Sequence, residues 1–236
     1  QLFFVDIKML KKAAALPVNY LTAYLMMVHQ AAIREGEWFL IHGIGGGVGI
    51  AALQIAKNLN LKIIGTSSGW KHDRIREMGV EHLIDYRTEN FKDRVLDITE
   101  GRGVDVIIDS LGGTALLDSY NCLAEFGRLI SYGFSKAAPG TKKNIFKILP
   151  EYFGMPKFNP MNLMANNKGV FGFHLGLIRK RQDLVKKYGS LLFNWLDEGL
   201  ISPEIDSVFP LSKADEAHQY ISDRKNFGKV LLAPEE

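Results

Sequence analysis

Five glycines fall within the seven residues from Gly43 to Gly49, and this stretch offers the clearest chemistry in the chain. Glycine tolerates a positive φ and lets the backbone approach a phosphate group closely. The spacing G-x-x-G-x-x-G fits Gly43, Gly46 and Gly49, although Ile44 breaks the stricter G-x-G-x-x-G fingerprint that would end at Gly49. The stretch therefore predicts a cradle for a pyrophosphate. Taken alone, it also fits a tight strand-to-helix turn that holds no ligand.

The residues on either side place this loop between a strand and a helix. Residues 38–42 read Trp-Phe-Leu-Ile-His, a short run typical of a buried strand. After the loop, apolar residues recur at helical spacing, at Val48, Ala51, Ala52, Ile55, Ala56 and Leu59. A helix that begins there would offer unpaired N–H groups and a partial positive charge to an anion. Strand, glycine turn and helix is the context that dinucleotide binding requires.

Strand-like and helix-like segments alternate along the rest of the chain. Strands are expected at residues 61–66, 82–86, 104–110, 128–133 and 169–175. Helices are expected at residues 71–78, 91–100, 116–126 and 182–196. This alternation predicts an α/β fold, a Rossmann-type doubly wound parallel sheet with helices on both faces. Ligands of such sheets bind at the carboxyl ends of the strands, so the residues that follow each strand are candidates for the site.

The pattern divides the chain into three parts. Residues 1–12 are expected to form a strand remnant and linker, residues 13–199 a nucleotide-binding domain, and residues 200–236 a C-terminal segment. The C-terminal segment carries expected strands at 205–209 and 229–232 and a helix at 213–221. Helices are also expected at 13–16 and 18–32, with Pro17 at a helix start. Residues 136–168 hold four prolines and several aromatic residues, which we expect to pack on the domain rather than face a membrane or a substrate.

Composition narrows the class of protein. The 236 residues include 29 basic and 26 acidic side chains, and the net charge of +3 is too balanced to argue for nucleic acid or an anionic membrane. The single cysteine, Cys122, excludes a disulfide or a multi-thiolate zinc site within the chain, and its apolar neighbours predict a buried thiol. The six histidines do not fall at metal-ligand spacings. No signal peptide and no transmembrane segment are recognisable, so a cytoplasmic protein is expected.

Several separated motifs together resemble one known family. They are residues 13–24 (AAALPVNYLTAY), 42–49 (HGIGGGVG), 84–86 (IDY), 109–113 (DSLGG) and 228–232 (GKVLL). In this order they are similar to the medium-chain dehydrogenase/reductase superfamily and to its zinc-free, zeta-crystallin-like quinone oxidoreductase branch. Residues 172–176 and 205–208 further resemble one subgroup, the homologues of a synaptic-vesicle membrane amine-transport protein. The family begins with a GroES-like domain that has no counterpart here, so the C-terminal segment would belong with that missing catalytic domain.

The resemblance implies a cofactor site, position by position. The residues expected to bind the cofactor are Gly43, Gly46, Gly47, Val48 and Gly49 at the pyrophosphate; Thr22 beside the nicotinamide; Ser67, Lys71 and Tyr86 around the adenosine 2′-phosphate; Leu111, Gly112, Tyr132, Gly133 and Phe134 along the adenine and ribose; Phe173 and Leu175 at the carboxamide end; and Asn226 and Lys229 from the tail. Plainer interpretations stay open. The Thr22 hydroxyl could bond to its own helix backbone. Ser67, Lys71 and Tyr86 could form an exposed, solvated rim, and Asp109 could be a turn residue at the end of its strand.

The reaction implied by the resemblance is hydride transfer from a nicotinamide cofactor to a quinone or an activated alkene. The cofactor carries that chemistry, and the sequence assigns no catalytic residue and no metal. Two other classes stay open: a cofactor-binding module with a vesicle- or lipid-associated role, and a subunit of a larger reductase. The family also pairs the strand equivalent to residues 170–173 across a two-fold axis, which implies a homodimer.

The end of the second expected strand favours NADPH over NADH. In NAD-binding folds, an acidic residue at that point holds the ribose 2′-hydroxyl. Residues 65–71 read Gly-Thr-Ser-Ser-Gly-Trp-Lys, and the first carboxylate comes only at Asp73. Hydroxyl groups and a lysine would bind a 2′-phosphate, whereas a carboxylate would repel it. NADPH is therefore the expected cofactor.

Overall fold

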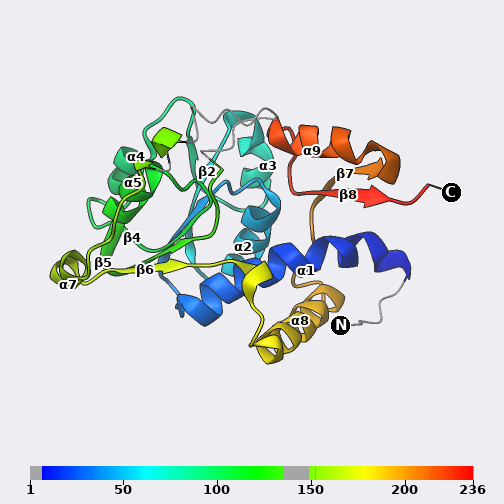
Figure 1. Cartoon of the computed structure of the whole chain (residues 1–236), viewed down its shortest axis with the longest axis horizontal. Helices are drawn as coiled ribbons and strands as arrows, with labels where there is room; N and C mark the ends of the chain where they lie inside the picture. Colours follow the sequence, from blue (N-terminus) through cyan, green and yellow to red (C-terminus); the bar gives the residue numbers. More distant parts are fainter. Residues whose placement is uncertain (1–6, 136–148, 152, 236) are drawn as a thin grey trace.

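A six-stranded parallel sheet forms the centre of the molecule in the computed structural model, which describes residues 7–135, 149–151 and 153–235. The strand order is β3-β2-β1-β4-β5-β6 (Figure 1). The strands of this sheet are β1 (Trp38–His42), β2 (Lys62–Ser67), β3 (His82–Asp85), β4 (Val104–Asp109), β5 (Leu123–Ser131) and β6 (Gly169–Gly172). All neighbouring strands are parallel, and the order reverses beside β1, where doubly wound sheets bind ligands.

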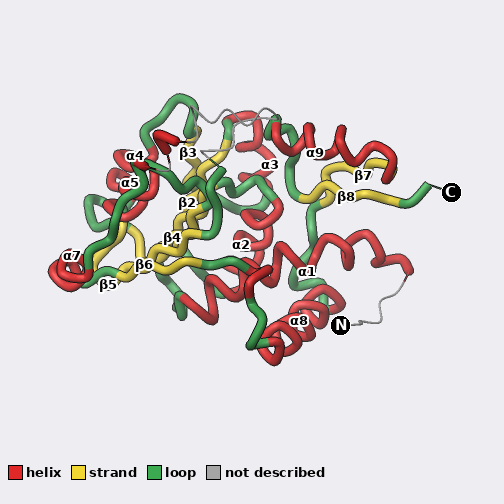
Figure 2. The backbone as a smooth tube through the Cα atoms, viewed as in Figure 1, coloured by secondary structure: helices red, strands yellow, loops and turns green. Residues whose placement is uncertain are grey.

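Helices cover both faces of this sheet, as Figure 2 shows. Side chains alternate along β1, so Phe39 and Ile41 join one core while Leu40 joins the other. The first core includes residues from α1 (Leu10–Tyr24), α2 (Gly47–Asn58), α3 (His72–Glu77) and α8 (Gln182–Asp197). The second includes residues from α4 (Phe91–Ile98) and α5 (Ala115–Asn121). This arrangement confirms the predicted Rossmann-type α/β fold.

The first helix differs from the expectation of a break at Pro17. A single helix, α1, runs from Leu10 to Tyr24 with Pro17 inside it, and a π-helical turn continues it from Leu25 to Gln30. Pro17 lies on the exposed side, where water can solvate the carbonyl group that its missing N–H leaves unbonded. Leu16 and Tyr20, each 1% exposed, lie in the core on the other side, and their burial favours the continuous helix.

The C-terminal segment forms a small unit of its own beside the sheet. Strands β7 (Ile205–Pro210) and β8 (Lys229–Ala233) pair in parallel, and α9 (Ala214–Ser222) connects them, at the right of Figure 1. The start of this segment is tied to α2, because the Gln54 amide exchanges two hydrogen bonds of 2.8 Å with the backbone of Ser202. Its relation to a further domain stays a prediction.

Several element boundaries also differ from the expectations. Residues 10–12, expected in a linker, begin α1, while residues 1–6, where the strand remnant was expected, lie outside the described part of the chain. The helix expected at 116–126 ends at Asn121, and β5 already begins at Leu123. Strand β6 ends at Gly172, so residues 173–175 lie beyond it. No helix among the described residues is long and apolar enough to cross a membrane.

The proline-rich excursion is described only in part, because residues 136–148 and 152 lie outside the described residues. Its second half contains a helix that was not expected, α7 (Pro160–Asn166), whose N-cap Asn159 accepts a hydrogen bond from the Met161 amide. The ring of Phe158 packs 5.2 Å from that of Tyr120, as expected for an aromatic residue that folds onto the domain. Phe153 differs, because 78% of its surface is exposed.

Candidate functional site

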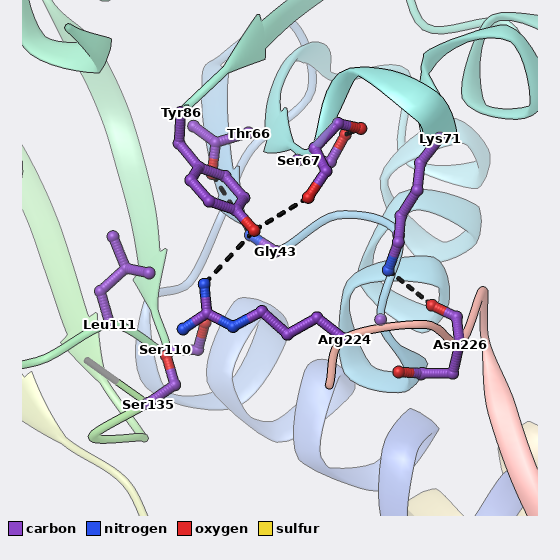
Figure 3. Close-up of a pocket in the computed structure, with 13 residues that line it drawn as sticks. Gly43, Thr66, Ser67, Lys71, Tyr86, Ser110, Leu111, Ser135, Arg224 and Asn226 are labelled. Atoms are coloured by element: carbon purple, nitrogen blue, oxygen red, sulfur yellow. Dashed lines mark hydrogen bonds between the residues drawn. The ribbon is translucent and has the colours of Figure 1, made fainter. Parts of the chain in front are cut away.

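One pocket lies where β1, β2 and β4 end, and the C-terminal segment borders it (Figure 3). Its cavity volume is about 160 Å³, and it is open to solvent. The residues that line it are Gly43, Gly45, Gly46, Thr66, Ser67, Ser68, Lys71, Tyr86, Ser110, Leu111, Ser135, Arg224 and Asn226. Seven of these were expected from the sequence: Gly43, Gly46, Ser67, Lys71, Tyr86, Leu111 and Asn226. The carboxyl ends of neighbouring strands bring six of them together, and Asn226 comes from the C-terminal segment, before β8.

The glycine loop turns the chain sharply from β1 into α2. Gly43 has a φ of +67°, and its carbonyl oxygen accepts a hydrogen bond of 2.9 Å from the Gly46 amide. Gly46 is the N-cap of α2, and no side chain caps that end. The first bond of the helix runs from the Ile50 amide to the Gly46 carbonyl, so the amides of residues 47–49 precede the helical ladder. Such amides are suited to bind a phosphate.

Neighbouring atoms lie close to several glycines of the loop, and at Gly49 these atoms belong to the backbone. A Cβ atom at Gly49 would lie 2.3 Å from the Gly43 carbonyl oxygen and 2.6 Å from the Ile44 Cα atom. A Cβ atom at Gly45 would lie 2.7 Å from the Lys71 side chain, and one at Gly47 would lie 2.4 Å from the Asn19 amide. The loop is therefore closely packed, and its glycines present backbone without side chains to the pocket.

Polar groups gather at the end of β2, where the sequence predicted contacts with a 2′-phosphate. Lys71 is only 7% exposed, and its Nζ donates a 2.5 Å hydrogen bond to the backbone carbonyl of Asn226. Burial lowers the pKa of Lys71, while the nearby Tyr86 phenol and Asp206 carboxylate act in the opposite direction. The hydroxyl groups of Ser68 and Tyr86 lie 2.9 Å apart. The described residues that line the pocket include no carboxylate.

Arg224 brings a second cation to this corner, and sequence reasoning missed it. Its Nη1 donates a 3.3 Å hydrogen bond to the Tyr86 hydroxyl, and the guanidinium carbon lies 5.7 Å from the centre of that ring. Desolvation acts to raise the pKa of the Tyr86 phenol, but the hydrogen bonds from Ser68 and Arg224 outweigh it and lower the pKa. Other lining residues that were missed are Gly45, Thr66, Ser68, Ser110 and Ser135. All five lie at or just beyond the ends of expected strands, where ligands were expected, but the sequence assigned none of them a contact of its own.

The tail closes one side of the pocket by binding the glycine loop directly. The Gly228 amide donates a 3.0 Å hydrogen bond to the Gly45 carbonyl, and Gly228 forms a parallel β-bridge with Gly46. Beside it, Phe227 is 1% exposed, and the Arg74 guanidinium lies 3.8 Å from the centre of its ring. These contacts hold the segment from Arg224 to Gly228 against the pocket.

The opposite wall comes from the loops after β4 and β5. A Cβ atom at Gly112 would lie 2.5 Å from the Phe134 ring and 2.8 Å from the Gly133 carbonyl oxygen, so these three expected residues pack together. The Tyr132 amide donates a 3.0 Å hydrogen bond to the Asp109 carbonyl oxygen. Desolvation raises the pKa of the Tyr132 phenol to about 12, which keeps it neutral. Leu111 is the expected residue of this wall that lines the pocket.

The remaining expected residues do not line the pocket. Gly47, Val48 and Gly49 form the first turn of α2, directly after the lining residue Gly46, and Thr22 is buried in α1, 7% exposed. Phe173 and Leu175 pack against the first core beyond β6. Lys229 begins β8, its amide bonds to the Glu204 carbonyl oxygen at 2.8 Å, and burial lowers the pKa of its side chain. Roles for these residues toward a cofactor stay predictions.

The described residues contain no cluster of side chains suited to bind a metal ion. Within residues 7–135, 149–151 and 153–235, no group of three or more histidine, cysteine, aspartate or glutamate side chains could hold a metal ion. Cys122 is buried, and desolvation raises the pKa of its thiol to about 12. A neutral buried thiol is a poor metal ligand and a poor nucleophile.

Known proteins that resemble this chain include synaptic-vesicle protein homologues and a quinone oxidoreductase. A synaptic vesicle membrane protein VAT-1 homolog from Danio rerio is 37% identical over 226 residues, which are 95% of this chain and 46% of that protein. The crystal structure of a human VAT-1 homolog-like protein superimposes with a TM-score of 0.80 at 31% identity, over 99% of this chain and 65% of that one. Escherichia coli quinone oxidoreductase complexed with NADPH gives a TM-score of 0.80 at 28% identity, over 95% and 65%.

A family model described as zinc-binding dehydrogenase matches residues 78–232, which is more than half of the chain. The chain spans about half the length of the curated relatives it matches, 46% in one fish relative and 57% in a human one. The matched region contains β3 to β8 and six of the residues that line the pocket, which are Tyr86, Ser110, Leu111, Ser135, Arg224 and Asn226. The chain therefore belongs to the zinc-binding dehydrogenase family, in the VAT-1-like group of the medium-chain dehydrogenase/reductase superfamily.

Proposed function

We propose that this chain is the cofactor-binding part of an NADPH-dependent oxidoreductase that transfers a hydride to a quinone or an activated alkene. The observation that carries the proposal is the corner at the end of β2. There Lys71 and Arg224 supply two cations, and Ser67, Ser68 and Tyr86 supply hydroxyl groups. A solved relative of the same fold, the Escherichia coli quinone oxidoreductase, is described as complexed with NADPH.

NADPH, when bound, supplies the hydride, and the residues of this chain would bind and orient it. The amides that begin α2 would hold the pyrophosphate, because they point out of a bare helix N-terminus. Arg224 would form charge-assisted hydrogen bonds with the 2′-phosphate, and Lys71 could add one while it keeps its bond to Asn226. The family description names zinc, but the described residues contain no cluster that fits a metal, so no step is assigned to one.

The cofactor preference tests this proposal directly. Dissociation constants for NADPH and NADH would be measured by titration calorimetry for the wild type, Lys71→Ala and Arg224→Gln. Each variant is expected to lose about ten- to a hundredfold in NADPH affinity, because a hydrogen bond to a charged group contributes about 1.5–3 kcal/mol. NADH carries no 2′-phosphate, so its affinity should change little.

Arg76→Ala is the matched control for these two variants. Arg76 lies on α3, the helix that follows Lys71, but its side chain is 57% exposed and pairs with Asp73 at 2.9 Å, away from the pocket. It should bind both cofactors like the wild type. A wild type that binds NADH as tightly as NADPH contradicts the proposed preference, as does a preference that survives in both Lys71→Ala and Arg224→Gln.

We also propose that β6 pairs with the same strand of a second copy to form a homodimer. β6 is the edge strand of the sheet, and Phe171 on it is 36% exposed. The Phe173 amide bonds to the Ser131 carbonyl oxygen of β5, so the alternation of the strand turns the backbone groups of residues 170 and 172 away from β5. On that side the Gly172 carbonyl oxygen accepts a 3.1 Å hydrogen bond from the Gln30 side chain, and the backbone groups of Val170 face the edge. An apolar edge of this kind invites pairing.

Light scattering after size exclusion tests the dimer. The wild type is expected to run as a dimer and Val170→Lys as a monomer, because a buried lysine would lose its hydration at the interface. Val208→Lys is the control, since Val208 is 40% exposed on β7, away from β6. A wild-type monomer contradicts the proposal, and so does a dimer that both lysine variants retain.

A further inference from the structure

A chain of buried polar side chains lies beneath the pocket, and the proposed function does not use it. Its members are Thr66, His42, Ser119 and Asp109, and none is more than 1% exposed. The His42 Nδ1 lies 3.1 Å from the Thr66 hydroxyl, and its Nε2 lies 3.1 Å from the Ser119 hydroxyl. Ser119 in turn donates a 2.6 Å hydrogen bond to the Asp109 carboxylate. A buried polar group costs free energy unless it is hydrogen-bonded, so the loss of one member leaves its neighbours unsatisfied and destabilises the whole network.

The proton positions along this chain follow from its donors and acceptors. Because the Ser119 hydroxyl gives its proton to Asp109, its oxygen accepts from the Nε2–H of His42. A neutral imidazole then has Nδ1 as an acceptor, and the Thr66 hydroxyl donates to it. Burial lowers the pKa of His42, although the Asp109 charge opposes it, and this favours the neutral ring. All the bonds therefore run in one direction, toward the carboxylate.

Each end of the chain holds a loop that borders the pocket. At one end, the Thr66 oxygen accepts a 3.3 Å hydrogen bond from the amide of Gly43, the first residue of the glycine loop. At the other end, the second oxygen of Asp109 accepts hydrogen bonds of 2.8 Å from the amides of Leu111 and Gly112. The pyrophosphate side and the adenine side of the pocket are thus connected through side chains, although 68 positions separate Gly43 from Leu111 in the sequence.

We propose that Thr66, His42, Ser119 and Asp109 are positioning residues that set the distance between the glycine loop and the loop after β4. This inference rests on the proposed function, because it takes the pocket between these loops as the NADPH site. Cofactor recognition needs both loops in place at once, and groups held by a rigid, fully bonded support bind without an ordering cost. None of the four is assigned a contact with the reacting atoms.

Ser119→Ala tests the proposal, because it removes the one hydroxyl that joins His42 to Asp109 and leaves the bonds from Asp109 to the loop intact. The matched control is Thr99→Val. The Thr99 hydroxyl is also buried, 6% exposed, and accepts a 3.0 Å hydrogen bond from the Gly103 amide, far from the pocket. Both variants lose a buried hydroxyl and should melt at lower temperatures. Only Ser119→Ala is expected to weaken NADPH binding, by about tenfold.

Two measurements on the protein without cofactor make the test independent of NADPH binding. In Ser119→Ala, hydrogen exchange at the amides of Gly43, Leu111 and Gly112 should speed up several-fold, while Thr99→Val leaves these amides unchanged. In the wild type, the nitrogen-15 shifts of the His42 ring should show the neutral tautomer with its proton on Nε2 near pH 7. The tautomer measurement uses the wild type only, so it does not depend on whether a variant folds.

The outcomes separate this inference from the proposed function. A wild type that fails to bind NADPH contradicts the proposed function, and the exchange and tautomer measurements still decide whether the chain of side chains fixes the two loops. Equal NADPH affinities of Ser119→Ala and Thr99→Val overturn the inference, as does unchanged exchange at both loops in Ser119→Ala. A charged His42 ring, or a proton on Nδ1, overturns the assigned direction of the bonds and with it the proposal.

Discussion

Replacing Gly49 with alanine is expected to weaken NADPH binding by roughly a hundredfold or more, because the displaced loop amides would no longer face the pyrophosphate. The added Cβ would lie 2.3 Å from the Gly43 carbonyl oxygen and 2.6 Å from the Ile44 Cα and carbonyl oxygen. All of these are backbone atoms, so the loop itself must move away from the helix start. Overpacking of this kind costs about 1–3 kcal/mol, which lowers the melting temperature by about 2–4 °C for each kcal/mol.

Gly172→Ala is the control for this variant. Gly172 has no atom within 4 Å of an added Cβ and lies outside the pocket. Its NADPH affinity should equal that of the wild type. If Gly49→Ala binds NADPH as the wild type does in a fluorescence titration, then the glycine loop does not hold the pyrophosphate.

The second large effect is expected in turnover. The 236-residue chain should oxidise NADPH with a benzoquinone several orders of magnitude more slowly than Escherichia coli quinone oxidoreductase, which this chain covers to 65% of its length. The pocket is open to solvent, and a substrate that is neither positioned nor shielded from water loses most of its rate enhancement. The measurement is the fall in absorbance of NADPH under matched conditions.

The same turnover measurement separates two classes of function. NADPH binding with negligible turnover fits either an incomplete reductase site or a cofactor-binding module, and a longer form of the chain that gains activity identifies the reductase. A rate of the 236-residue chain equal to that of the bacterial enzyme contradicts the expectation, because these residues alone would then form the whole substrate site.

The sheet could be predicted from the sequence because its signals are local. Each strand is a short apolar run, and each following helix repeats apolar residues at helical spacing, so the order of elements and the position of the glycine loop follow directly. Pro17 misled the prediction because a proline signals a break, whereas tertiary packing of Leu16 and Tyr20 outweighs that signal.

The site could be predicted where a residue lies at the end of a strand, or in or next to a family motif, as Asn226 does before residues 228–232. Arg224 meets neither condition, since it is a single arginine in a polar segment and lies 138 positions from Tyr86. Its left-handed backbone, with a φ of +58°, also has no signal in the residue type. The contact between His42 and Ser119 joins residues 77 positions apart, and only the packing of α5 on the sheet brings them together.

Hydrogen–deuterium exchange of the wild type with and without NADPH tests the central claim most directly, because it reports where the cofactor binds. Slower exchange is expected in residues 43–49, 66–71, 110–113 and 224–228 when NADPH is present, with little change in β6, α7 and α8. NADH at the same concentration should give weaker protection at residues 66–71 and 224–228. Protection confined to other segments, or equal exchange with and without NADPH, would contradict NADPH binding in this pocket.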